Sequence, residues 1–92
     1  MTDLLLEPHV VVVTLRYFAG ARAAAGVEEE RVALPIGSTV ADALRRVSVR
    51  GPALARVIAA SSVLVDGVHR RSADATLIDG ATLDVLPPFA GG

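Results

Sequence analysis

Hydrophobic residues recur along this chain with two different periods, which predict strands toward both ends and helices between them. The segment Val10 to Phe18 is rich in β-branched and aromatic residues and alternates with a period of two. One face of this predicted strand carries the expected core residues Val11, Val13 and Leu15. Arg16 and Phe18 share the opposite face, so Phe18 is an aromatic residue on the polar side.

A short helix and a second strand are predicted next. Ala-rich sequence over Ala19 to Ala25 favours a helical turn that ends at Gly26, because glycine adopts the left-handed conformation of a C-terminal cap without strain. The segment Glu28 to Leu34 ends on alternating apolar residues before Pro35 and indicates a strand.

The main helix is predicted from a capping box followed by a period close to 3.6. Thr39 is expected to cap the helix while Asp42, three residues later, reaches back to it. The apolar face of this helix comprises Val40, Ala43, Leu44 and Val47. Pro52 then permits a second short helix through Leu54, Val57 and Ile58.

Two Asp-Gly pairs predict the turns of the C-terminal half. Asp66-Gly67 accepts the positive φ angles of a tight hairpin turn within Ser62 to Arg71. Asp79-Gly80 precedes a last strand, Thr82 to Leu86, in which alternation points Leu83 and Val85 inward and Asp84 and Leu86 outward.

The order of elements predicts an α+β fold of the β-grasp, ubiquitin-like type. A mixed sheet is expected, covered on one face by the main helix. We expect residues 1–8 to form a flexible N-terminal leader, residues 9–88 the β-grasp domain and residues 89–92 an extended, flexible C-terminal Gly-Gly tail.

Composition then removes several classes of function. A chain of 92 residues supports one core, and its net charge of -1 gives no basic surface for nucleic acid. The chain has no Cys, so it has no thiolate nucleophile and no thiolate metal site. Neither a signal peptide nor a membrane span is indicated, and a cytoplasmic protein that binds no membrane is expected. The glycines of the segments DGV and AGAR lack the spacing of a phosphate-binding loop. We expect no cofactor or metal to be bound by this chain.

The terminal sequence PPFAGG points to a reactive C-terminus. Pro87 and Pro88 favour an extended departure from the last strand, while Gly91 and Gly92 remove every side chain near the terminal carboxylate. Such a terminus is thin enough to enter the active site of another protein. A carboxylate is a poor electrophile until it is converted to an acyl-adenylate, so a partner enzyme must supply the ATP chemistry.

Four segments in this order carry a family resemblance: YFAGAR, STVADALRR, VLVDG and LIDGATLDVLPPFAGG. They resemble the MoaD/ThiS ubiquitin-like sulfur carriers, and most closely the small, sulfur-carrier subunits of molybdopterin synthase. The resemblance spans nearly the whole chain after the leader, and its most specific part is the strand that leads into the terminal Gly-Gly.

The resemblance implies a role in molybdenum cofactor biosynthesis. Gly92 would be adenylated by a ubiquitin-activating-like enzyme, which uses ATP, and then converted to a thiocarboxylate. The tail residues Pro87, Pro88, Phe89, Ala90 and Gly91 would insert into the large, catalytic synthase subunit, where the sulfur passes to a pterin precursor. The chain would thus not be catalytic alone, and the synthase would contain two small and two large subunits.

Three further residues match family positions that contact a partner. Phe18 and Leu86 correspond to positions that contact the large subunit, and Arg22 matches a basic position that can pair with an acidic partner surface. Exposed hydrophobic residues and solvated arginines are common in any protein, so an ordinary surface role is the alternative for all three.

Three other functions stay open. The first is a sulfur carrier for thiamine thiazole or cysteine synthesis, although thiazole carriers usually lack the Pro-Pro pair. The second is a ubiquitin-like protein modifier, which would join the same terminus to lysines of targets. The third is a β-grasp binding domain with an inert tail.

Overall fold

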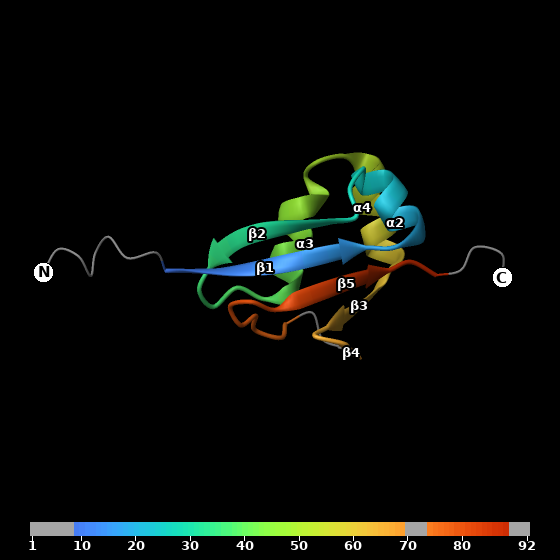
Figure 1. Cartoon of the computed structure of the whole chain (residues 1–92). Helices are drawn as coiled ribbons and strands as arrows, with labels where there is room; N and C mark the ends of the chain where they lie inside the picture. The colour runs from blue at the N-terminus through green and yellow to red at the C-terminus, as the bar shows by residue number, and fades with distance from the viewer. Residues whose placement is uncertain (1–8, 70–73, 89–92) are drawn as a thin grey trace, which may run out of the picture.

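The computed structural model describes residues 9–69 and 74–88, which form a mixed sheet with helices packed on one face (Figure 1). In chain order the elements are β1 (Val10–Tyr17), α2 (Ala19–Ala25), β2 (Glu29–Pro35), α3 (Val40–Ser48), α4 (Pro52–Ala60), β3 (Ser62–Val65), β4 (Val68–His69) and β5 (Thr82–Leu86). In the view of Figure 1, α3 passes behind β1 and β2, and α2 and α4 lie near the end of β1. The segments predicted as leader, 1–8, and tail, 89–92, lie outside the described residues.

The sheet has the strand order β2-β1-β5-β3-β4 within the described part of the chain. β1 and β5 lie side by side at its centre and run parallel, whereas every other neighbouring pair is antiparallel. This arrangement confirms the predicted α+β, β-grasp fold. Because β1 and β5 run parallel, their C-terminal ends lie side by side at one end of the sheet.

The core lies between the sheet and its helices, as the alternation in the sequence predicts. Val13, Leu15, Leu83 and Val85 are fully buried on the face of the sheet that the helices cover. Three helices, rather than the single main helix expected, contribute to this layer: Ala21 of α2, Val47 of α3, and Leu54 and Ile58 of α4 join the same cluster. The nine residues of α4 are as many as those of α3, so the Pro52 start signal marks a full helix.

Local capping and turn predictions are confirmed. The Thr39 hydroxyl accepts a hydrogen bond from the Asp42 amide, and the Asp42 carboxylate accepts one from the Thr39 amide at 2.8 Å. This backbone hydrogen bond lowers the pKa of Asp42. Asp66 and Gly67 adopt φ angles of 51° and 82°, as the hairpin turn between β3 and β4 requires.

A polar network closes the core at the end of β1. The Tyr17 hydroxyl donates to the Glu30 carboxylate of β2 at 2.5 Å, and the same carboxylate pairs with Arg50, just after α3. Burial, reinforced by the hydrogen bond to Glu30, raises the pKa of Tyr17. These contacts tie β1, β2 and the end of α3 together.

Candidate functional site

The candidate site lies on the sheet face opposite the helices, here called the open face. It lies at the end of this face where β1 and β5 both stop. Tyr17 pairs with Val85 in the parallel register, which brings the next residues of the two strands, Phe18 and Leu86, to the same edge. The Phe18 amide donates to the Val85 carbonyl at 3.3 Å. Two residues that are 68 positions apart in the sequence are therefore held beside one another.

An ion pair organises the centre of the open face. The Arg16 guanidinium donates to both oxygens of Asp84, with Nε to Oδ1 at 2.6 Å and Nη2 to Oδ2 at 2.8 Å. This hydrogen bonding raises the pKa of Arg16. The guanidinium carbon also lies 5.9 Å from the ring centroid of Phe18, within the range of a cation–π contact.

Asp84 corrects one sequence-based expectation. Alternation places it on the face opposite Leu83 and Val85, as predicted, but the residue is only 6% exposed rather than open to solvent. The reason is its position on a central strand between β1 and β3, where Arg16 forms a bidentate pair with its carboxylate. Sequence alternation gives the face of a residue but not what covers it on that face.

Hydrophobic side chains extend the open face along β1. Val10, Val12 and Phe18 are 42%, 38% and 39% exposed, respectively. The sequence analysis identified Phe18 but missed Val10 and Val12, because they belong to an unbroken run of four valines. Because side chains alternate along a strand, Val12 and Val10, two and four residues before Thr14, could have been assigned to the face of Arg16 from the sequence.

Pro87 and Pro88 carry the chain beyond the edge of the sheet. Pro87 is half-buried and Pro88 is exposed. The two prolines border a hollow of about 430 Å³, whose other walls are residues of α2 and α4: Ala19, Gly20, Arg56, Val57 and Ala60. The remaining predicted tail residues, Phe89, Ala90, Gly91 and Gly92, lie outside the described residues.

The turn from Phe18 into α2 contains a strained residue. Ala19 adopts a φ of 48°, in the left-handed region that non-glycine residues rarely occupy. This conformation lets the chain turn from the extended Phe18 directly into a helix. The strained residue, Ala19, therefore lies directly after Phe18 and lines the hollow beside Pro87 and Pro88.

Arg22 lies one helical turn beyond Phe18. Its amide is 3.4 Å from the Phe18 carbonyl, and its guanidinium pairs with Glu28 at 3.3 Å. Both partners are more than half exposed, with side-chain exposures of 52% and 78%. Such an exposed pair contributes little to stability and is readily exchanged for another acidic group.

The described part of the chain offers no metal-ligating cluster of three or more His, Cys, Asp or Glu residues. None of its helices has both the length and the apolar character that crossing a membrane demands. The open face provides apolar contact area around the Arg16–Asp84 ion pair, at the end of the sheet where β5 leads into Pro87.

The fold and this site define a ubiquitin-like β-grasp protein whose last strand leads into a Gly-Gly sequence. The chain belongs to the ThiS family, whose sequence profile matches residues 15–92. The predicted resemblance to MoaD/ThiS proteins is thereby confirmed.

Solved structures show the same relationship. A chain described as a putative molybdopterin converting factor, subunit 1, from Pyrococcus furiosus is 32% identical, with a TM-score of 0.77 over 86% of this chain and 99% of that chain. SAMP1 from Haloferax volcanii is 28% identical, with a TM-score of 0.78 over 88% of this chain and 99% of that chain. A complex of subunits 1 and 2 of molybdopterin-converting factor from Helicobacter pylori contains a chain with the same fold, at 20% identity and a TM-score of 0.61, over 89% of this chain and 100% of that chain.

Proposed function

We propose that this protein is a sulfur carrier for molybdenum cofactor biosynthesis and that the carboxylate of Gly92 is its working group. The observation that carries the proposal is the parallel pairing of β1 with β5. It places the prolines that precede the Gly-Gly sequence at the same edge as Phe18 and Leu86. A partner that binds this edge of the open face is therefore in position to receive the terminus.

The chemistry proceeds on the partner enzymes. An activating enzyme transfers AMP from ATP to the Gly92 carboxylate and releases pyrophosphate, which gives the acyl carbon a good leaving group. A persulfide sulfur then attacks this carbon and expels AMP. Cleavage of the resulting acyl disulfide by a second thiol leaves a thiocarboxylate on Gly92. The chain itself has no Cys, so the persulfide and the thiol both come from other proteins or small molecules.

We further propose that the large, catalytic subunit of molybdopterin synthase binds the open face. Phe18 and Leu86 form the apolar centre of this interface, where aromatic and aliphatic anchors concentrate binding energy. Arg22 lies at its rim and exchanges Glu28 for an acidic residue of the partner. Pro87 to Gly91 pass into the active site of the large subunit, which transfers the sulfur to the pterin precursor. The assembly contains two small and two large subunits. The choice of this partner is supported by the similarity to the Pyrococcus furiosus chain described as a subunit 1 of molybdopterin converting factor.

A protein modifier is the second candidate function, and the similarity to SAMP1 from Haloferax volcanii favours it specifically. The same activated carboxylate would then form an amide bond with a lysine of a target protein. The nine basic residues of this chain are all Arg, so it cannot form lysine-linked chains of itself. Sulfur carriage for thiamine thiazole or cysteine synthesis is the remaining alternative within the family.

Intact mass spectrometry tests the proposal. Incubation with ATP, the activating enzyme and a persulfide donor is expected to replace one oxygen of the protein by sulfur. A variant without Gly91 and Gly92 should keep its circular dichroism spectrum and show no change in mass. If the full chain also keeps its mass, while an established carrier gains sulfur in the same mixture, the carrier proposal is wrong.

The pathway is tested by the destination of the sulfur. The sulfurated protein is mixed either with the large synthase subunit and pterin precursor or with thiazole-forming enzymes. Sulfur transfer to the pterin alone is expected. Transfer only to the thiazole product would assign the chain to that pathway, and adducts on lysines of other proteins would favour the modifier function.

A further inference from the structure

The free edge of β2 is a second surface, distinct from the ends of β1 and β5 that carry Phe18 and Leu86. β2 is the first strand in the sheet order, so among residues 9–69 and 74–88 its only neighbouring strand is β1. The Tyr17 amide donates to the Glu28 carbonyl, and the Ile36 amide donates to the His9 carbonyl. In an antiparallel pair the bonded residues alternate, so the backbone groups of Arg31 and Ala33 point away from β1.

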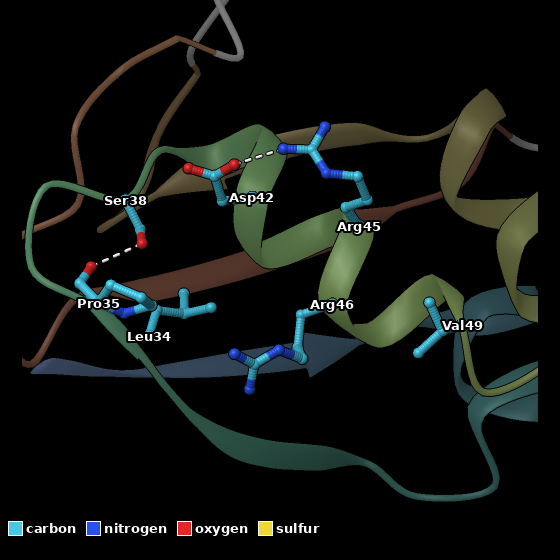
Figure 2. A pocket seen from close by; sticks show the side chains of 7 residues that line it. All are labelled: Leu34, Pro35, Ser38, Asp42, Arg45, Arg46 and Val49. Carbon is cyan, nitrogen blue, oxygen red and sulfur yellow. Dashed lines mark hydrogen bonds and ion pairs between the residues drawn. The ribbon is translucent and has the colours of Figure 1, made fainter.

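A groove runs along this edge, between β2 and α3. It consists of two adjoining hollows of about 530 and 350 Å³, and Arg46 lines both. Figure 2 shows the larger one, with Leu34 and Pro35 on the strand side and Asp42 and Arg45 on the helix side. Arg46 Nη1 donates to the outward carbonyl of Ala33 at 3.2 Å, so the Arg46 side chain reaches from α3 across the groove to the free edge.

Part of this edge is already satisfied within the chain. The Pro35 carbonyl accepts hydrogen bonds from the amide and the hydroxyl of Ser38, at 3.1 and 2.6 Å. The Arg31 amide and carbonyl and the Ala33 amide form no backbone hydrogen bond with any of the described residues, so they present the unpaired groups of an edge strand.

The groove carries a surplus of positive charge. Its two acidic residues, Asp42 and Glu30, are paired with Arg45 and Arg50. Arg46 also lines it and forms no ion pair with any of the described residues. Arg31 lies on the same edge, but its side chain shares the open face with Thr14, its partner on β1. Within the groove, Arg46 is thus the cationic side chain that has no acidic partner among the described residues.

We propose that this groove binds an extended, acidic segment of a partner protein, which adds to the sheet as a strand beside β2. Backbone pairing with Arg31 and Ala33 supplies affinity, apolar side chains of the segment contact Val49, which lines the larger hollow and is 80% exposed, and its acidic residues pair with Arg46. A second copy of this chain is a poorer occupant, because pairing two β2 edges would bring the arginines of both copies together. The site needs neither the terminus nor the open face, so it goes beyond the sulfur-carrier function.

The probe is a synthetic, amidated peptide of sequence Asp-Asp-Val-Ile-Val-Ile, titrated into the full chain and followed by amide NMR. We expect saturable shifts with a Kd below about 1 mM. The sharpest readout is hydrogen exchange: the outward amides of Arg31 and Ala33 should exchange fast in the free protein and slow down with peptide. The inward amides of Glu30 and Val32 should be protected in both states. A peptide with Lys-Lys in place of Asp-Asp and one with N-methylated central residues should both fail to bind.

Two variants separate the charge from the backbone contribution. Arg46→Glu is expected to weaken peptide binding about tenfold, whereas Arg56→Glu, an equivalent reversal on exposed α4, should not change it. Ala33→Pro removes one outward amide while leaving the bonds to β1 intact, and should abolish binding. The Arg46 result stands whether or not the proline variant folds.

Three outcomes would overturn the proposal. The first is an absence of saturable binding. The second is a set of shifts confined to the open face, around Val12 and Phe18. The third is protection of Arg31 and Ala33 without peptide, together with a dimer by sedimentation, which would make a second copy the occupant. None of these results depends on ATP or sulfur transfer. Failure of the groove proposal would therefore not count against the sulfur-carrier function, which is tested separately.

Discussion

The two leucines of β5 provide a matched test of the fold and of the proposed interface, because the same substitution acts on opposite faces of one strand. Leu83 is fully buried against the helices, whereas Leu86 is half-buried on the open face. We expect Leu83→Ala to reduce stability strongly. We expect Leu86→Ala to reduce it little and to weaken binding of the large subunit instead.

The magnitude follows from burial. Truncating Leu83 removes three buried carbons, or about 2.4 kcal/mol at roughly 0.8 kcal/mol each, and the residual cavity raises the cost to about 3–4 kcal/mol. A domain of 92 residues has a free energy of unfolding of roughly 5–14 kcal/mol, so this is a large share of it. Half-buried Leu86 loses about 1 kcal/mol on the same basis.

Urea unfolding followed by circular dichroism measures both costs, since the chain has no Trp for a fluorescence signal. A loss of 3 kcal/mol corresponds to a fall in Tm of roughly 15 °C. Equal costs for the two variants would show that the leucines do not lie on opposite faces, and the inferred register of β5 would then be wrong. Unchanged binding of the large subunit by Leu86→Ala would remove Leu86 from the interface but leave the fold intact.

Two further predictions concern local structure. Ala19→Gly should raise the free energy of unfolding by about 0.5–1 kcal/mol, since glycine adopts the φ of 48° found there without strain; a fall in stability would refute the strained conformation. Asp42→Asn tests the cap of α3. The folded-state pKa of Asp42 is lowered, so its carboxylate stabilises the fold above the unfolded pKa, near pH 4, and that contribution is lost as the pH falls through the folded pKa. Denaturation midpoints of wild type and variant should therefore differ at pH 7 and converge as the pH falls through the folded-state pKa of Asp42; a constant difference would contradict this role.

The sequence by itself determined the local elements and their order. Gly26, the Thr39–Asp42 capping box and Asp66-Gly67 lie where predicted, because caps and tight turns depend on residues within four positions of one another. The inward faces of the strands followed from a period of two. The hypothesis that the Gly92 carboxylate is the reactive group also came from the sequence, through the terminal PPFAGG and the family resemblance.

Only the tertiary structure decided which strands are neighbours. The parallel pairing of β1 with β5 joins residues 68 positions apart, and no local pattern encodes such a pairing. This pairing buries Asp84 beneath Arg16 and brings Phe18 beside Leu86. The strand order also leaves β2 at an edge of the sheet, where Arg46 of α3 donates to the Ala33 carbonyl. Long-range pairing is selected by the packing of the whole core rather than by any single segment, which explains why the faces of the strands could be predicted from the sequence but not their neighbours.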